Sequence, residues 1–194
     1  AEIELKFPFW FKELEGIHSR TDFDLAAHEK FSGRKLQYFD PERNETYVPY
    51  VVETSVGLDR LFLAIFSNCL KDEVLEDGSE RTVLTLPPAL APVKAAILPL
   101  MKKDGLGEYG EKIFNDLKYD FNVIYEEKDS IGKRYRRQDA IGTPFCITID
   151  HDSLTDNTVI LRDRDTMKQE RVAVADLRRI IDEKTNFRNL LQKI

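Results

Sequence analysis

Two polar side chains and an arginine stand in an apolar stretch at residues 51–66, VVETSVGLDRLFLAIF. Residues two apart on a β-strand share a face, so Glu53 and Ser55 would point into one site. Gly57 lets the chain turn. Arg60 then falls in the first turn of an apolar helix, where a cation and free backbone N–H groups face an anion together. This arrangement suits a polyphosphate, although alone it also fits a solvated arginine and a surface carboxylate.

Further candidate side chains precede this stretch. Glu13 and Glu15 are two apart on a predicted strand and should share a face just before Gly16. The spacing does not show which of the two carboxylates belongs to a site. Arg20 is a weaker site candidate, and Asp24 is expected in an ion-pair network that orders its loop. The histidines are scattered and the cysteines have no ligand-spacing partner, so we expect no structural metal.

A basic string, KRYRRQ, lies in the second half of the chain, at residues 133–138. Unpaired bases are bound by stacking on aromatic rings and guanidinium planes, while lysine and arginine hold the phosphates. At helical spacing not all of the cations can face one ligand, and Asp139 is close enough to pair with one of them. The candidate RNA contacts are Lys133, Arg134, Tyr135, Arg136 and Arg137.

The elements that must position these residues change character near residue 80. Before it, the patterns predict strands at 3–9 and 13–18, a helix at 23–31, a hairpin of 36–39 with 47–55, and a helix at 58–70. The charged stretch 71–80 loses periodicity, so we place a domain boundary there. We therefore expect domains at 1–80 and 81–194.

After residue 80, strands alternate with helices. We predict strands at 81–86, 121–126, 144–149, 157–162 and 168–174, and helices from Pro92, at 108–119, 131–141 and 175–183. The side-chain charges of residues 162–165 alternate in sign, which predicts an ion-paired turn. This succession argues for a mixed, mostly parallel α/β sheet, after an α+β first part built on an antiparallel sheet.

Composition narrows the class of protein. The chain has 194 residues and a formal net charge of −6, with 9 basic against 17 acidic residues up to residue 80 and 20 against 18 after it. The acidic first part suits carboxylates gathered around cations. No apolar run approaches membrane-spanning length and no signal sequence is apparent, so we expect a soluble, cytoplasmic protein with reduced cysteines. An alanine at position 1 and a strand that begins at once favour a segment of a longer protein.

The 51–66 stretch resembles motif 3 of class II aminoacyl-tRNA synthetases. The strings ELEGIHSRTDFDLAAHEKFSG (13–33), LPPALAPVKAAILPL (86–100) and SIGKRYRRQDAIGTPFCITID (130–150) narrow the resemblance to the glycyl-tRNA synthetases, in their C-terminal part. The resemblance implies the end of a catalytic domain followed by an α/β anticodon-binding domain. Motifs 1 and 2 are missing.

The resemblance also implies roles for single residues. Glu53 and Ser55 would contact glycine, Arg60 would hold the phosphates of ATP, and Glu13 would bind Mg²⁺ on the ATP or help to hold the substrate. The complete enzyme would be a homodimer that forms glycyl-adenylate and transfers glycine to tRNA(Gly). This segment alone should supply anticodon binding and a partial, inactive site.

Two alternatives remain from the sequence. A non-catalytic, synthetase-like nucleic-acid-binding accessory protein would share the fold, but it has no need of an ammonium pocket beside a phosphate-binding arginine. A synthetase of the same subgroup for threonine, proline or histidine is the other, and the string at 13–25 favours glycine.

Overall fold

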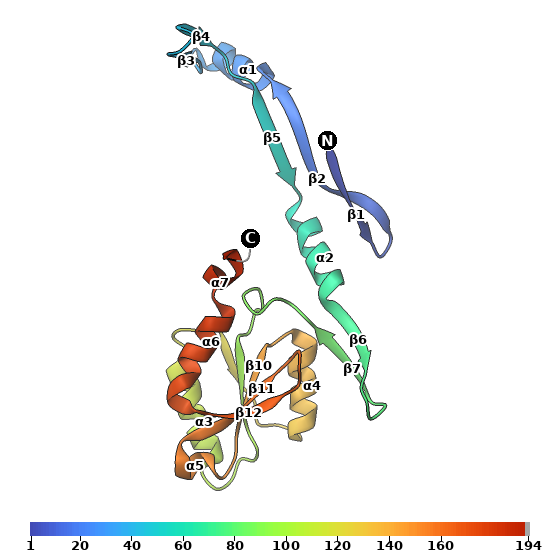
Figure 1. Cartoon of the computed structure of the whole chain (residues 1–194), viewed down its shortest axis with the longest axis vertical. Coiled ribbons are helices and arrows are strands. Elements are labelled where there is room, and N and C mark those ends of the chain that lie inside the picture. Colours follow the sequence, from blue (N-terminus) through green and yellow to red (C-terminus); the bar gives the residue numbers. More distant parts are fainter. Residues whose placement is uncertain (193–194) are drawn as a thin grey trace. The chain divides into compact units, whose positions relative to one another are not determined.

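The computed structural model describes residues 1–192, and the chain divides into two compact units, Ala1–Ser67 and Asn68–Ile194 (Figure 1). The division lies earlier than the boundary that we expected near residue 80. The charged stretch 71–80 is not a linker, because it belongs to an antiparallel hairpin of β6 (Leu70–Val74) and β7 (Glu80–Leu84) that turns at Gly78.

Unit 1 contains a three-stranded antiparallel sheet in the order β1-β2-β5. A helix, α1, and a small hairpin, β3-β4, connect β2 to β5, and α2 follows β5. The expected hairpin of 36–39 with 47–55 is only partly present, because Pro49 separates two strands that join different sheets. The bounds are β1 Glu2–Phe7, β2 Trp10–Thr21, α1 Phe23–Ser32, β3 Tyr38–Asp40, β4 Glu45–Tyr47, β5 Val51–Val56 and α2 Leu58–Cys69.

Unit 1 buries few apolar side chains. Phe7 and Ala64 are its buried hydrophobic residues, whereas Trp10 is 70% exposed and Phe62 on α2 is 67% exposed. A folded domain of ordinary stability covers most of its large apolar side chains. Within this chain, therefore, the sheet and α2 of unit 1 keep apolar surface that their own packing does not cover.

Unit 2 is a five-stranded mixed sheet in the order β12-β11-β10-β8-β9. Two of its strand pairs are parallel and two are antiparallel, so it is less parallel than the sequence suggested. The bounds are β8 Ala95–Pro99, α3 Leu106–Leu117, β9 Val123–Tyr125, α4 Ile131–Ile141, β10 Phe145–Ile149, α5 Ser153–Asp156, β11 Thr158–Asp163, β12 Gln169–Ala173, η1 Val174–Asp176, α6 Leu177–Thr185 and α7 Phe187–Leu191.

Helices cover both faces of this sheet. Side chains of α3 and α6 pack on one face in the larger core, around Ile97, Ile147 and Leu161, and α4 packs on the other, around Leu98 and Cys146 (Figure 1). Burial raises the pKa of the Cys146 thiol to about 12. No helix within residues 1–192 is both long and apolar enough to cross a membrane.

The helix that we predicted from Pro92 is wrong, since residues 95–99 form β8. All five residues of β8 are buried, and the strand lies between β10 and β9 in the sheet. A strand covered on both faces reads as a continuous apolar run without alternation, and such a run is not distinguishable from a buried helix by its pattern. Pro99 ends the strand instead of kinking a helix.

Candidate active site and nucleic-acid interface

The pairing of β2 with β5 places four residues on one face of the unit 1 sheet, two of them candidates from the sequence. Gly16 lies directly opposite Ser55, and His18 lies directly opposite Glu53. Residues paired across antiparallel strands share a face, and so do residues two apart on one strand. The structure therefore brings Glu53 and Ser55 together, as their spacing predicted, and adds Gly16 and His18 beside them.

Glu13 reaches the same face, whereas Glu15 does not, which corrects the expectation that the two share one. The partner of Ile3 is Glu15 and the partner of Glu4 is Glu13, so Leu14 is skipped in the pairing. One extra residue in a strand reverses the alternation of side chains beyond it. Accordingly, the Glu13 carboxylate comes within 3.5 Å of the position that a Cβ on Gly16 would take.

Arg60 is tied to the backbone of β2, the strand that carries Glu13. Helix α2 begins after Gly57, whose carbonyl accepts a hydrogen bond from the N–H of Leu61 at 2.9 Å. In the first turn, Arg60 donates a hydrogen bond from Nη1 to the carbonyl oxygen of Glu13 at 2.7 Å. A guanidinium has five N–H donors, so the exposed Arg60 keeps donors for an anion.

Arg20 connects the carboxylate of Glu53 to α1. It lies 3.4 Å from Glu53 and forms a two-pronged ion pair with Asp24, at 2.9 and 3.2 Å. The hydrogen bond from Arg20 holds the pKa of the Asp24 carboxyl below its usual range. The expected ion-pair network at Asp24 is therefore present, and it also holds Arg20 next to the candidate ammonium site.

We call the group of Glu13, Gly16, His18, Glu53 and Ser55 the strand-face site. Sequence reasoning found its three acidic or hydroxyl members and missed Gly16 and His18. Gly16 and His18 are two apart and share a face, but Gly16 is three residues after Glu13, a spacing that places the two on opposite faces of a regular strand. What the sequence did not show was the skipped residue that brings Glu13 to their side.

In unit 2, two of the five candidate RNA contacts on α4 point inward. The guanidinium of Arg134 is fully buried and donates to the carbonyl oxygens of Pro99 and Glu126, at 2.7 and 3.0 Å. Its Nε has no hydrogen-bond partner within residues 1–192, and burial lowers its pKa. Arg134 therefore holds the ends of β8 and β9 on α4 instead of offering its charge to solvent.

Tyr135 also faces the protein. Its hydroxyl and that of Thr148 are 2.6 Å apart, and the guanidinium of Arg162 lies 4.7 Å from the centre of its ring. Arg162 in turn makes two bonds with the buried carboxylate of Asp139, at 2.7 and 3.0 Å. The expectation that Asp139 pairs with a cation of its own helix is wrong, because the carboxylate faces the sheet.

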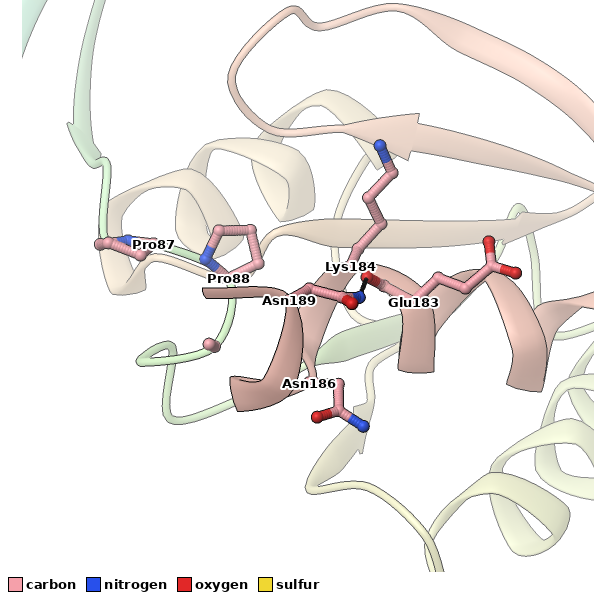
Figure 2. Close-up of a pocket in the computed structure, with 7 residues that line it drawn as sticks. Pro87, Pro88, Glu183, Lys184, Asn186 and Asn189 are labelled. Carbon is pink, nitrogen blue, oxygen red and sulfur yellow. Dashed lines mark hydrogen bonds between the residues drawn. The ribbon is translucent and has the colours of Figure 1, made fainter. Parts of the chain in front are cut away.

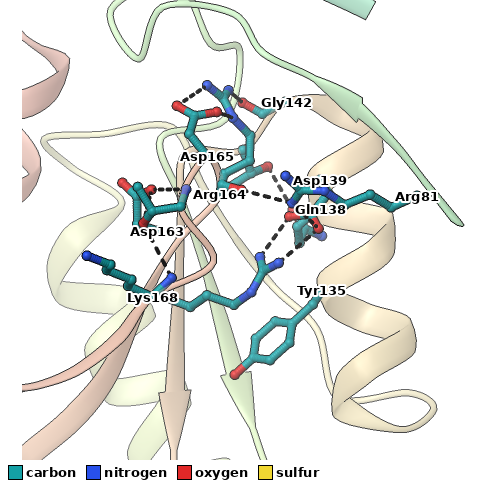
Figure 3. A network of polar contacts seen from close by, with 12 residues as sticks. Arg81, Tyr135, Gln138, Asp139, Gly142, Asp163, Arg164, Asp165 and Lys168 are labelled. Atoms are coloured by element: carbon teal, nitrogen blue, oxygen red, sulfur yellow. Dashed lines mark hydrogen bonds and ion pairs between the residues drawn. The ribbon is translucent and has the colours of Figure 1, made fainter. Parts of the chain in front are cut away.

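Asp139 is the centre of a buried ionic network (Figure 3). It accepts a further hydrogen bond from Arg81 of β7 at 3.2 Å, and Arg81 also bonds the carbonyl oxygen of Arg164 at 3.0 Å. The turn after β11 contains the expected ion pair, between Arg164 and Asp165 at 2.7 Å. The network joins the β6–β7 hairpin, α4 and the β11–β12 turn.

Three cations of α4 remain near the surface. Arg137 is paired with Glu126 and Asp129, at 2.5 and 2.8 Å, and Arg136 reaches the hydroxyl of Ser79 at 3.3 Å. Lys133 is exposed and has no ion pair or hydrogen bond among the described residues. Lys133 is therefore the α4 cation most available to a phosphate.

A polar cavity of about 400 Å³ lies elsewhere in unit 2, between the proline segment after β7 and the junction of α6 with α7 (Figure 2). Asn186 and Asn189 line it, and amide side chains both donate and accept hydrogen bonds. Lys94 supports the proline segment by donating to the carbonyl oxygens of Pro88 and Ala89, at 3.1 and 2.8 Å. The cavity offers neutral polar groups of the kind that bind base edges.

Sequence comparison connects both units to one family. Residues 94–184 match the anticodon binding domain family. The chain is 55% identical over 171 residues to the glycine–tRNA ligase of Chlorobaculum tepidum. This aligned region spans 88% of this chain and 36% of that ligase. It is 54% identical over 187 residues to the glycine–tRNA ligase of Macrococcus caseolyticus. This aligned region spans 96% of this chain and 40% of that ligase. The chain is homologous to glycine–tRNA ligases.

The similarity extends over 187 residues and therefore runs through both units. The chain spans about two fifths of the length of the curated ligases that it matches. A solved structure, the RNA binding domain of threonyl-tRNA synthetase from Cryptosporidium parvum Iowa II, aligns with 94% of this chain and 42% of its own at a TM-score of 0.68. With 20% identity, that likeness supports the fold alone.

Proposed function

We propose that this chain forms part of a glycine–tRNA ligase, which activates glycine with ATP and joins it to tRNA(Gly). The observation that carries the proposal is the convergence of Glu13, Glu53 and Ser55 on one face of a sheet, with Arg60 bonded to the backbone of Glu13, in a homologue of these ligases. The sparse core of unit 1 supports the view that it completes its packing within a larger catalytic domain.

The strand-face site provides the groups that glycine activation requires. The Glu53 carboxylate accepts hydrogen bonds from the substrate ammonium, and Ser55 contacts it from the same face. Arg60 faces the phosphates of ATP and offsets the charge that develops as pyrophosphate leaves. Glu13 is the residue that would hold Mg²⁺, and the ion would neutralise phosphate charge.

Unit 2 is proposed to bind the anticodon of tRNA(Gly). Lys133, Arg136 and Arg137 contribute from the outer side of α4, while Arg134 and Tyr135 hold the helix against the sheet. The amide groups of Asn186 and Asn189 offer a second polar surface in the same unit. As the family resemblance implies, the complete ligase is a cytoplasmic homodimer.

The test is binding of this chain to glycine tRNA transcripts with native and altered anticodons at two salt concentrations. Phosphate contacts weaken as salt rises, whereas base discrimination survives as a ratio of affinities. Tighter binding to the native anticodon at both salts is expected. Equal and salt-sensitive binding to both transcripts would contradict anticodon recognition.

Activation is tested separately by glycine-dependent ATP–pyrophosphate exchange. The complete ligase should catalyse exchange with glycine, whereas this chain alone should not, because the alignment of the α-phosphate requires residues outside it. Exchange with threonine, proline or histidine in place of glycine would refute the substrate assignment. No exchange with any amino acid would support the accessory nucleic-acid-binding protein.

A further inference from the structure

Gly16 lies at the centre of the strand-face site. It belongs to β2, the middle strand of the sheet, and sits directly opposite Ser55 on β5, next to the pair of His18 and Glu53. Gly16 is buried although it has no side chain, because its neighbours lie over it. A side chain at this position would project from the same face as those of Ser55 and Glu53.

The backbone of Gly16 does not explain why glycine is present. Its φ lies outside the left-handed region, which contains the glycines at positions 33, 78, 105 and 142. An L-residue could therefore adopt this conformation without strain. The requirement is one of space, not of backbone freedom.

The space in question belongs to the site. A Cβ on residue 16 would come within 2.6 Å of Nε2 and 3.2 Å of Cδ2 of His18, and within 3.5 Å of Oε1 of Glu13. The first of these distances is well inside van der Waals contact. The imidazole of His18 and the carboxylate of Glu13 thus converge on the volume that the missing side chain leaves between them.

We propose that Gly16 forms the floor of the amino-acid pocket and sets how closely glycine approaches Glu53 and Ser55. This inference rests on the proposed function, because it takes the strand-face site as the place where the substrate ammonium meets Glu53 and Ser55. A methyl group on the floor would lift the substrate away from both groups.

A purely structural reason for glycine at position 16 predicts a different result. Gly16 could serve only to let the His18 ring lie across the strand, and the ring is the far end of a flexible side chain that can rotate away. Removing the ring separates the two explanations. In the double variant Gly16→Ala with His18→Ala the collision with the ring is gone, and the added methyl group remains on the floor of the pocket.

The experiment measures KM and kcat for glycine by ATP–pyrophosphate exchange in the complete ligase and its Gly16→Ala, His18→Ala and double variants. Gly16→Ala should raise KM about tenfold to a hundredfold, the usual effect of one unaccommodated methyl group, with a smaller fall in kcat. The double variant should keep this increase relative to His18→Ala. Gly132→Ala on α4 is the matched control, since nothing lies within 4 Å of its Cβ position.

Two results would overturn the proposal. One is a Gly16→Ala ligase with the wild-type KM, and the other is a double variant with the KM of His18→Ala. If Gly16→Ala alone fails to fold, as judged by circular dichroism, the double variant decides between the same two outcomes. A wild-type enzyme that exchanges nothing with glycine refutes the proposed function instead, so the two failures are distinguishable.

Discussion

Replacing Asp139 by asparagine should destabilise unit 2 severely. The Asp139 carboxylate is fully buried and bonds the guanidinium groups of Arg162 and Arg81, whose side chains are 5% and 2% exposed. Asparagine keeps the shape but removes the charge, and its amide N–H₂ must face an N–H donor. Breaking a buried ion pair by removing one partner lowers the free energy of unfolding by about 3–5 kcal/mol.

This loss is large against the stability of an ordinary domain, which is about 5–15 kcal/mol. Hydrogen exchange by mass spectrometry is the suitable assay, because it reports each unit of the intact chain separately. The amides of β10 lie at the centre of the sheet and exchange only through large-scale opening. Their protection should fall roughly a hundredfold to a thousandfold or more, at about 1.4 kcal/mol for each factor of ten.

The matched control is Asp116→Asn, which makes the same chemical change in an exposed pair. Asp116 is 71% exposed and lies 3.3 Å from Arg178. A surface ion pair contributes about 0–1 kcal/mol, so β10 protection should change by less than about tenfold. If Asp139→Asn changed β10 protection as little as Asp116→Asn does, the central role of Asp139 in the network would be refuted.

Three further predictions concern unit 2. Lys133→Ala should weaken tRNA binding and reduce the slope of log affinity against log salt by about 1, with unfolding free energy unchanged within about 0.5 kcal/mol; an unaltered slope would exclude a phosphate contact. Gly142→Ala should lower the free energy of unfolding in urea by about 1–3 kcal/mol, because φ is +83° and its Cβ would lie 3.0 Å from the Leu84 carbonyl oxygen; an unchanged midpoint would contradict this. Hydrogen bonds from Arg171 lower the pKa of Asp150 to about 2, below its unfolded value, so the stabilisation is present above pH 4 or so and is lost as pH falls toward about 2. Unfolding measured across that range should show a flatter pH dependence for Asp150→Asn, and parallel curves would refute the assignment.

Local sequence signals predicted the elements that have clear ends. Helix α4 has the bounds expected from the sequence, 131–141, and Gly142, at positive φ, ends it. The face shared by Glu53 and Ser55 likewise follows from the period of a strand. Such features depend on residues close in sequence.

The features that depended on distant partners were missed. The sequence of β8 does not distinguish a strand from a helix, because its burial on both faces comes from the rest of the sheet. The inward orientation of Arg134 depends on carbonyl groups at the ends of β8 and β9. The face on which Glu13 lies depends on Leu14, which is skipped when β2 pairs with β1. A charged residue on a helix is usually solvated, so the basic string alone could not reveal which of its cations is structural.

The β6–β7 hairpin determines where the chain can be divided for separate study of its units. A cut at residue 80 would delete β6, leave β7 as an unpaired edge and remove Glu73, whose carboxylate bonds Arg81 at 2.7 and 2.8 Å. Exposed strand edges promote aggregation. An excised second unit that begins at residue 68 keeps both strands and the partners of Arg81, so domain dissection should start there and not at the charged stretch.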